Sequence, residues 1–316
     1  MQHAAQPQVA FLESVHPILW ERLEAAGMAC EHAESVSRES ILHGSLNHAE
    51  GIVLRSRLML DAALMDAMPR LQWIARSGAG LENIDLEAAQ QRGIRVYASP
   101  EGNATAVGEH AVGQLLALLH RLVAADRHVR AGGWDREAHR GIELEARTVG
   151  IIGFGNMGRS FAKCLQGFGC KVLAYDKYIR GFEGTWGVQE ADLAQLQAEA
   201  DVISMHVPLT DETRHMVNTP WIEAFHRPFH FINTARGEVV RTEDVLHALD
   251  GGQVLGAALD VLEFEKRSLE GLDGRPPALQ RLLEHPRTVV SPHVAGWSVE
   301  SYFKLSNVLA DKILNA

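Results

Sequence analysis

Short apolar runs alternate with stretches of helical periodicity along the whole chain. The apolar runs of the first third predict four strands, at residues 9–12, 51–54, 71–75 and 94–97. A helical pattern from Asp61 to Met68 lies between two of these runs, and Pro69 just beyond it is typical of a helix end. This regular alternation of strands and helices predicts an α/β fold with parallel sheets.

A long helical stretch, residues 104–130, separates this region from a second and denser series of strands. Its apolar residues recur at spacings of three and four, as at Val107, Ala111 and Leu115, so we expect one long helix with an apolar face. Six strands are predicted after it, at residues 147–152, 171–175, 201–206, 229–233, 253–260 and 288–291. A further helix is predicted at residues 299–314.

Composition and charge narrow the possible partners. The chain has 316 residues, enough for about two ordinary domains, and its hydrophobic content of 46% allows a large core without stabilising disulfide bonds. The formal net charge of −10 argues against nucleic acid or an anionic membrane as the main partner. No apolar run reaches the roughly 18 residues of a membrane span, and the first residues lack the features of a signal peptide. Cys30, Cys164 and Cys170 do not form an even, spaced framework, so we expect reduced thiols in a cytoplasmic protein.

Residues 153–158 have the glycine spacing of a dinucleotide phosphate loop. The segment follows an apolar strand and opens a helical pattern, so the first N–H groups of that helix would point at phosphates. The first glycine permits the tight turn, the second lets the backbone approach the pyrophosphate, and the third lets helix and strand pack closely. The predicted phosphate-binding residues are Gly153, Gly155, Asn156, Met157 and Gly158. The alternative is a glycine-rich turn in an unrelated α/β domain.

Asp176 directly follows the strand 171–175. Its spacing along the sequence from the phosphate loop is about that of the carboxylate that binds the ribose hydroxyls of a dinucleotide. A carboxylate there would repel the 2′-phosphate of NADP, so the sequence predicts NAD as the cofactor. Lys177 and Arg180 follow closely and would weaken this preference.

Several further motifs occur in a characteristic order. They are Ser77-Gly78-Ala79-Gly80 through Asp85, Gly108-Glu109-His110, the loop at Gly153, His206-Val207-Pro208-Leu209-Thr210, Asn233-Thr234-Ala235-Arg236-Gly237, Ala258-Leu259-Asp260-Val261 through Glu265, and Ser291-Pro292-His293. Together they resemble the D-isomer-specific 2-hydroxyacid dehydrogenase family, and within it the short phosphoglycerate dehydrogenases that lack a regulatory domain. The resemblance implies two Rossmann-like domains with parallel sheets. An NAD-binding domain, residues 99–293, would be inserted into a substrate-binding domain of residues 1–98 and 294–316.

The resemblance also implies three catalytic residues. His293 would be the general acid/base, a task that suits imidazole because it titrates near neutral pH. Glu265 would orient that imidazole and stabilise its charged form. Arg236 follows a strand end and would hold the substrate carboxylate with two hydrogen bonds. Taken without the motifs, His293 is better explained as an ordinary surface or core residue, Glu265 could be a solvated loop acid, and Arg236 is equally well explained as a surface salt-bridge arginine.

Further cofactor and substrate contacts follow from the same resemblance. Asp260 would orient the nicotinamide carboxamide, and the other cofactor contacts would be His206, Val207, Pro208, Thr234, Ala235 and Asn103. The backbone of the small-residue loop could bind the substrate carboxylate, with a plain turn as the alternative. Its residues are Ser77, Gly78, Ala79 and Gly80. Arg55 could supply the cation that a phosphorylated substrate needs. Two departures from the family pattern are Glu82, where aspartate is usual, and Lys266, where proline is common.

We therefore expect an NAD-dependent oxidoreductase that transfers hydride between NAD(H) and a 2-hydroxy or 2-oxo acid, with 3-phosphoglycerate as a possible substrate. The alternatives are a hydroxypyruvate or glyoxylate reductase, or a non-catalytic NAD(H)-sensing protein of the same fold that binds a partner. The family implies a homodimer that packs through the helix beginning near Ala104. No metal site is expected, because adjacent Glu109 and His110 lack the one-turn spacing of a helical zinc motif.

Overall fold

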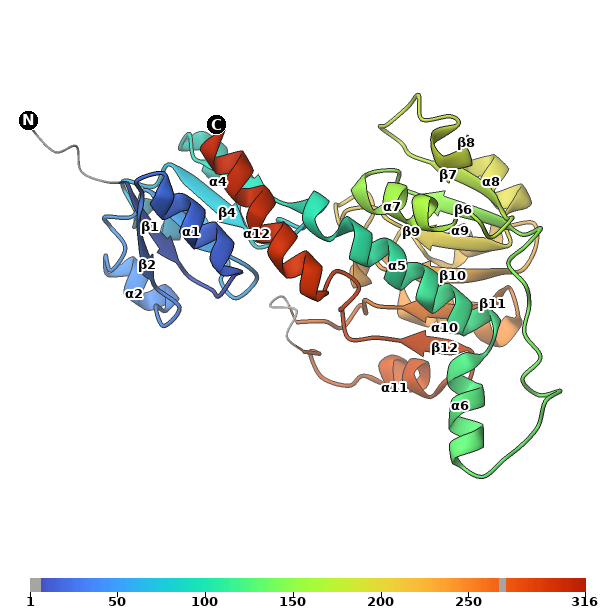
Figure 1. The fold of residues 1–316 in the computed structure, drawn as a ribbon. Helices are drawn as coiled ribbons and strands as arrows, with labels where there is room; N and C mark the ends of the chain where they lie inside the picture. The colour runs from blue at the N-terminus through green and yellow to red at the C-terminus, as the bar shows by residue number, and fades with distance from the viewer. Residues whose placement is uncertain (1–6, 267–270) are drawn as a thin grey trace, which may run out of the picture. The chain divides into compact units, whose positions relative to one another are not determined.

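The computed structural model describes residues 7–266 and 271–316. Part of the loop after Lys266, residues 267–270, therefore lies outside the described residues. The chain forms two compact units, one of residues up to 103 together with 297–316, and one of residues 104–296 (Figure 1). Each unit contains one parallel sheet, which confirms the predicted α/β class.

The first unit is built on a five-stranded sheet in the order β2-β1-β3-β4-β5. The strands are β1 (Gln8–Phe11), β2 (Ala29–His32), β3 (Gly51–Leu54), β4 (Trp73–Arg76) and β5 (Arg95–Ala98). The four predicted strands are present, each within two residues of its expected bounds. The sequence missed β2 because this edge strand, with the sequence ACEH, is only partly buried and shows no apolar run.

Five helices pack on this first sheet. They are α1 (Pro17–Ala25), α2 (Arg38–Leu42), α3 (Ala62–Asp66), α4 (Leu86–Gln91) and α12 (Val299–Leu314). The last of these is capped at its N-terminus by Ser298. The side chains and backbone N–H groups of Ser298 and Ser301 bond reciprocally in a capping box. Its apolar face, with Leu309 and Ile313, shares a core with residues of α1, β1 and β4. The C-terminal helix thus completes the unit that the N-terminal residues begin.

The second unit contains a seven-stranded parallel sheet in the order β12-β11-β10-β9-β6-β7-β8. The strands are β6 (Thr148–Ile152), β7 (Lys171–Tyr175), β8 (Gln189–Glu190), β9 (Val202–Met205), β10 (Phe229–Asn233), β11 (Val254–Leu259) and β12 (Thr288–Val290). All six predicted strands are present, and the two-residue β8 was missed. The strand order reverses at β6, where open α/β sheets bind their ligands.

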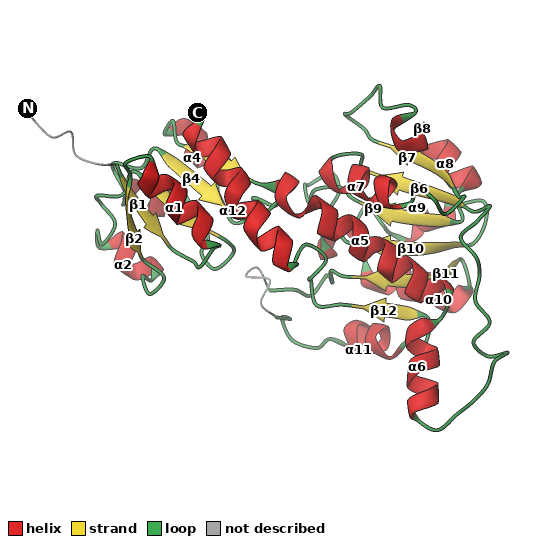
Figure 2. Ribbon diagram, viewed as in Figure 1, coloured by secondary structure: helices red, strands yellow, loops and turns green. Residues whose placement is uncertain are grey.

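Helices cover both faces of this sheet, as Figure 2 shows. On one face lie α5 (Pro100–Leu119) and α7 (Asn156–Cys164), and on the other lie α8 (Leu193–Glu199), α9 (Thr219–Glu223), α10 (Thr242–Gly251) and α11 (Pro277–Glu284). Neighbouring residues of β6 therefore enter different cores: Ile151 packs with the first set of helices and Ile152 with the second. A strand buried on both faces reads as a continuous apolar run, which explains why the sequence revealed it.

The prediction of one long helix over residues 104–130 was wrong in two respects. The helix begins at Pro100, and it ends at Leu119, with α6 (Leu122–Arg130) as a separate helix. Arg121 between them has φ 53°, a left-handed conformation that breaks the helical hydrogen bonding. Periodicity alone cannot show this break, because α6 keeps an apolar pattern although none of its residues is buried. Within the described ranges, no helix combines the length and the apolar character needed to cross a bilayer.

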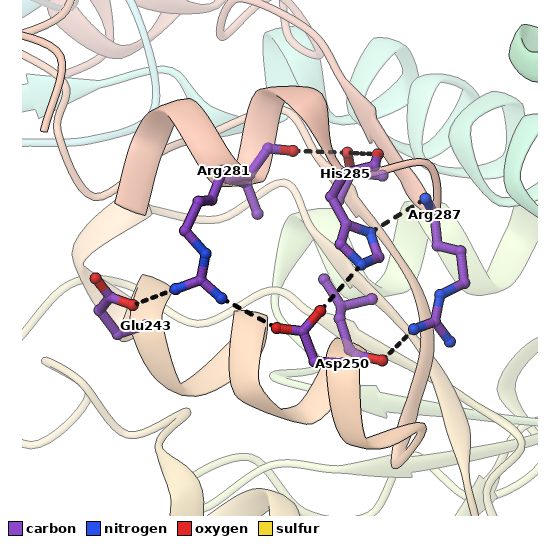
Figure 3. Close-up of polar contacts among 8 residues, drawn as sticks. Glu243, Asp250, Arg281, His285 and Arg287 are labelled. Carbon is purple, nitrogen blue, oxygen red and sulfur yellow. Dashed lines mark hydrogen bonds and ion pairs between the residues drawn. The ribbon is translucent and has the colours of Figure 1, made fainter. Parts of the chain in front are cut away.

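A polar cluster ties α11 to α10 in the second unit (Figure 3). Arg281 reaches Glu243 at 3.2 Å and Asp250 at 3.0 Å, and His285 Nε2 lies 3.7 Å from the same aspartate. Burial, together with the charge of Arg287, lowers the pKa of His285 despite that carboxylate. Arg281, Glu243 and Asp250 are about half exposed, so their ion pairs contribute at most about 1 kcal/mol, and the buried leucines of α11 contribute more to its packing. The cluster nevertheless fixes the helix that leads into β12.

Candidate active site

The turn after β6 has the backbone geometry of a phosphate loop. Gly153 has φ +92°, and a Cβ added to it would lie 2.6 Å from the carbonyl oxygen of His206. A Cβ on Gly158 would lie 2.0 Å from the carbonyl oxygen of Gly153, so the first turn of α7 packs directly on the loop. Around Gly155, by contrast, no atom lies within 4 Å of an added Cβ. Two glycines therefore close the loop, and the third leaves open space beside it.

The start of α7 is available to an anion. Its N-cap is Gly155, and no side chain caps the helix. The first N–H groups of a helix have no partner inside it and carry a partial positive charge, which favours a phosphate there. The open space at Gly155 and this uncapped helix start fit the pyrophosphate of a dinucleotide, with Asn156 and Met157 in the first helical turn.

Asp176 directly after β7 is held by backbone N–H groups. One carboxylate oxygen accepts hydrogen bonds from the N–H groups of Tyr178 and Ile179, both at 2.8 Å, and the other accepts from Phe154 in the phosphate loop at 2.7 Å. Burial alone would raise the pKa of Asp176, but these N–H groups and the charge of Arg180 outweigh it and hold the pKa below its ordinary value. The carboxylate is therefore charged and fixed beside the phosphate loop.

The two cations after Asp176 are engaged elsewhere. Lys177 forms an ion pair with Glu212, whose other carboxylate oxygen accepts a hydrogen bond from the Tyr178 hydroxyl. Arg180 donates to the backbone carbonyl oxygen of Asp176, not to its carboxylate. Because Glu212 compensates the charge of Lys177, the negative charge at Asp176 stays dominant in this region.

His206 and its neighbours follow β9. The imidazole of His206 is 9% exposed, its Nε2 lies 2.8 Å from Ser204 Oγ, and its ring packs 5.3 Å from that of Phe161. Burial lowers the pKa of His206 to about 3, so the ring is neutral. Its backbone touches the phosphate loop at Gly153, whereas Val207 packs on the core and Pro208 O accepts from the Thr213 hydroxyl. A contact of this segment with the cofactor stays a prediction.

A histidine–carboxylate pair lies between the loops that follow β11 and β12. His293 Nδ1 is 2.6 Å from Glu265 Oε2, and the two side chains are 23% and 15% exposed. The second oxygen of Glu265 accepts a hydrogen bond from the N–H of Leu262 at 2.5 Å. A charged carboxylate can only accept, so Nδ1 carries the proton and Nε2 is the nitrogen that can serve a substrate. The structure thus brings together the two residues that the family motifs paired.

The backbone of His293 is left-handed, with φ 54°. Its N–H donates to the carbonyl oxygen of Asp260 at 2.8 Å. The Asp260 carboxylate, 1% exposed, accepts from the N–H groups of Val294 at 2.9 Å and Ala295 at 2.8 Å. Asp260 therefore fixes the loop that carries His293 through these hydrogen bonds. Its predicted contact with a nicotinamide carboxamide is a further role that stays a prediction.

Arg236 follows β10 in an extended conformation and is half-buried. Asn233 shapes this turn, since its side chain donates to Arg236 O at 2.9 Å and accepts from the N–H of Ala235 at 3.0 Å. The hydroxyl of Thr234 is buried and has no hydrogen-bond partner among the described residues, and the same is true of His206 Nδ1. Such orphaned polar atoms around the phosphate loop suit a ligand that supplies the missing hydrogen bonds.

Apart from Arg236, the predicted substrate residues lie in the first unit. Glu13, which the sequence reading missed, accepts hydrogen bonds from the backbone N–H groups of Arg55, Ser56 and Arg57 at 2.7, 3.2 and 3.1 Å. The Arg57 guanidinium donates to the carbonyl oxygens of Leu12 and Val36 and is therefore bound to the protein backbone. Glu13 and Arg57 thus fix the loop that presents Arg55.

The Arg55 guanidinium stacks 4.2 Å above the ring of Trp297, which is 66% exposed. Arg76, 9% exposed, donates to Arg55 O at 3.2 Å and lies against Gly78, so a second cation sits beneath the small-residue loop. Within that loop Ser77 and Gly78 are buried, whereas Ala79 and Gly80 are half-buried. Trp297 and Arg76 were missed because stacking and burial join positions far apart in the sequence.

Two remaining expectations concern α5 and metals. Asn103 lies on α5, and its side-chain oxygen is buried without a hydrogen-bond partner among the described residues. Across residues 7–266 and 271–316, His, Cys, Asp and Glu side chains form no group of three or more that could hold a metal ion.

Comparisons with known proteins agree with this geometry. Residues 112–295 match the family described as D-isomer specific 2-hydroxyacid dehydrogenase, NAD binding domain. The chain is 35% identical over 291 residues to D-3-phosphoglycerate dehydrogenase from Archaeoglobus fulgidus, covering 92% of this chain and 53% of that protein. It is 36% identical over 262 residues to hydroxypyruvate reductase from Thermotoga maritima, covering 83% of each. The chain thus spans about half the length of the phosphoglycerate dehydrogenases that it matches.

A solved structure extends the comparison to the whole fold. D-lactate dehydrogenase from Aquifex aeolicus, complexed with NAD and lactic acid, gives a TM-score of 0.81 at 28% identity, covering 97% of this chain and 94% of that one. The chain therefore shares the fold of a known D-2-hydroxyacid dehydrogenase over nearly its whole length.

The charged Asp176 predicts that NADH is used in preference to NADPH. Replacing it in Asp176→Ser should weaken NADH binding and strengthen NADPH binding, because the repulsion of a 2′-phosphate is removed. Titrating the protein with each cofactor while following its intrinsic fluorescence measures both affinities. Asp192→Ser, which removes another carboxylate of the same unit, is the control. Tighter binding of NADPH than NADH by the unaltered chain would contradict the prediction.

Burial of neutral His206 predicts a dependence of stability on pH. An unfolded chain protonates this histidine below about pH 6.5, whereas the folded chain does so only near pH 3, so stability falls as pH decreases between these values. In His206→Gln this loss should shrink by up to about 1.4 kcal/mol per pH unit. Denaturant unfolding at several pH values between about 4 and 6 measures how steeply the free energy of unfolding depends on pH. The exposed His226→Gln variant serves as the control, and equal slopes in both variants would refute the assignment.

Proposed function

We propose that this chain, which belongs to the D-isomer-specific 2-hydroxyacid dehydrogenase family, is an NAD-dependent oxidoreductase that interconverts a 2-hydroxy acid and the corresponding 2-oxo acid. The observation that carries the proposal is the His293–Glu265 pair at 2.6 Å, in the same unit as the phosphate loop. Bound NAD(H) supplies the hydride acceptor in the oxidation and the hydride donor in the reduction.

His293 is the proposed acid/base. Its Nε2 donates a proton to the carbonyl oxygen of a 2-oxo acid during reduction and removes the hydroxyl proton of a 2-hydroxy acid during oxidation. The imidazole is positively charged on one side of this exchange, and the carboxylate of Glu265 on Nδ1 stabilises that charge while it holds the ring orientation. The pair is 15–23% exposed, so a ligand can approach while most of the bulk water is excluded.

Arg236 is the proposed ligand of the substrate carboxylate. A guanidinium can bind a carboxylate through two parallel hydrogen bonds, and its charge also polarises the neighbouring carbonyl group. The residue follows β10, at the carboxyl end of a central parallel strand, where ligands collect in open α/β sheets. For the small-residue loop Ser77–Gly80 in the first unit, the proposed role is to bind an anionic group of a ligand through its backbone N–H groups.

For the substrate we propose 3-phosphoglycerate, because Arg55 is held in place by the stacking on Trp297 and by the Glu13-bound loop, and would suit a second anionic group. Reduction of hydroxypyruvate or glyoxylate is the alternative, supported by the similarity to the Thermotoga maritima reductase over most of both chains. A cytoplasmic location is proposed on the three cysteines, all free in the structure. Burial raises the pKa of each thiol, that of Cys30 to about 11.

A substrate panel tests the activity. Loss of NADH absorbance would be followed with glyoxylate, pyruvate, hydroxypyruvate and its phosphate ester. We expect turnover of at least one, and a loss of about a hundredfold or more in kcat/KM for Arg236→Ala and His293→Gln, since each removes an electrostatic or proton-transfer contribution worth a few kcal/mol. Arg214→Ala, which removes an exposed arginine paired with Glu238, is the matched control. Tight NADH binding without turnover of any acid would favour the NAD(H)-sensing alternative.

We also propose a homodimer with two-fold symmetry. No residue of α6 is buried, and Leu122 and Val129 on it are 55% and 51% exposed. Trp134 in the following loop is 82% exposed, and Figure 1 shows α6 and this loop extending away from the sheet of the second unit. An exposed apolar surface of this kind is typical of a subunit interface.

Light scattering at micromolar concentration should therefore report twice the chain mass of 34.7 kDa. Introducing charges with Leu122→Lys and Val129→Lys should shift the protein towards the monomer, because burying an unpaired ammonium group at an interface is costly. Leu42→Lys, on an exposed apolar residue of α2, is the control. A monomer at this concentration in the unaltered protein would contradict the dimer.

A further inference from the structure

A partly buried polar network connects α5 to the loop that carries His293. Ser291 Oγ lies 2.9 Å from His110 Nε2, 2.9 Å from Gln114 Nε2 and 2.5 Å from Asp260 Oδ1. We propose that His110, Gln114 and Ser291 are positioning residues of the reaction: they hold the Asp260 carboxylate, which in turn fixes the backbone of His293. The inference rests on the proposed function of His293 as the acid/base.

The chemistry of the four groups sets the direction of these hydrogen bonds. A charged carboxylate only accepts, so the single hydroxyl proton of Ser291 goes to Asp260. Both lone pairs of the serine oxygen are then acceptors, and Gln114 and His110 must both donate to it. His110 therefore carries a proton on Nε2. All hydrogen bonds of the network point from α5 towards the buried carboxylate.

Gln114 shows that this direction is imposed by the site. Its side chain is 5% exposed, and its Oε1 is buried without a hydrogen-bond partner among the described residues. Rotating the amide by half a turn would place Oε1 against the serine, which would then have to donate to it and would present a lone pair to Asp260 at 2.5 Å. The unsatisfied amide oxygen costs free energy, but this orientation lets Gln114 Nε2 donate to Ser291 Oγ.

Asp260 transmits this arrangement to both sides of His293. Its carbonyl oxygen accepts from the N–H of His293, and its carboxylate accepts from the N–H groups of Val294 and Ala295. Together with the hydroxyl of Ser291, these bonds hold the residues that flank the histidine. They keep His293 at φ 54°, a conformation that costs a non-glycine residue free energy and persists only when its surroundings enforce it.

The support for the network is rigid. A Cβ added to Gly108 would lie 2.8 Å from the backbone carbonyl carbon of Ser160, so α5 packs in direct backbone contact with α7. Helix α7 begins at the phosphate loop. The same helix, α5, thus contacts the cofactor-loop helix and supplies the donors that position the loop of His293. Loss of those donors would move the histidine without moving the phosphate loop.

Hydrogen exchange and kinetics of the full-length protein test this role. In Ser291→Ala and Gln114→Leu, we expect the amides of residues 293–295 to exchange about tenfold faster or more, because their acceptor is no longer held. With the reactive substrate of the panel, kcat should fall roughly ten- to a hundredfold, as expected when a catalytic group is misplaced by about 1 Å. KM for NADH should not change. Ser291→Thr keeps the hydroxyl and should restore both exchange and kcat.

Thr288→Val is the matched control. It removes a hydroxyl three residues before Ser291, which donates to Leu282 O and His285 O and has no contact with the network. This variant should lose stability without faster exchange at residues 293–295 and without loss of kcat. Unchanged exchange in Ser291→Ala, or an equal loss of kcat in Thr288→Val, would overturn the proposal. Exchange does not depend on turnover, so an inactive wild-type protein would refute the proposed function and leave this measurement decisive for the network.

Discussion

The carboxylate of Asp260 is buried almost completely, and a charge in that position costs several kcal/mol unless hydrogen-bond donors surround it. Three donors come from the residues after β12, namely the hydroxyl of Ser291 and the N–H groups of Val294 and Ala295, and His110 Nε2 of α5 lies 3.5 Å from the same carboxylate. Satisfying this one charge therefore fixes the course of residues 291–295 after β12. His293, the proposed acid/base, lies within that segment, so its position follows from the requirement to solvate Asp260.

The cofactor side of the same sheet depends on a different constraint, the close approach of backbones. Gly153 and Gly158 bring β6, the chain after β9 and the start of α7 to distances at which a Cβ would collide with a carbonyl oxygen. Asp176 then ties the phosphate loop to the chain after β7 through the N–H of Phe154. Packing thus shapes the phosphate loop, whereas hydrogen bonds to a buried charge shape the loop that carries His293. Both lie at the carboxyl edge of one parallel sheet, as expected for an open α/β fold.

The sequence was sufficient for the parts of the molecule in which a local pattern has one structural meaning. Strands buried on both faces, such as β6, form continuous apolar runs, and the glycine spacing after β6 has a single backbone explanation. The half-exposed β2 and the two-residue β8 carry no such pattern. The break at Arg121 was missed because a left-handed residue between two amphipathic helices leaves their periodicity nearly intact. Family motifs identified His293 and Glu265, but the roles of Glu13, Arg76 and Trp297 depend on contacts between residues far apart in the chain.

The left-handed conformation of His293 links the energetics of the fold to its chemistry. In a loop without the hydrogen bonds to Asp260, the imidazole would adopt many orientations of similar free energy. Here the backbone strain, on the order of 1 kcal/mol, is offset by the hydrogen bonds of Asp260 on either side of the histidine. The ring is then oriented by Glu265, which is itself fixed by the N–H of Leu262. Both restraints originate in residues that follow β11, so one strand end sets the backbone of His293 and the direction of its side chain.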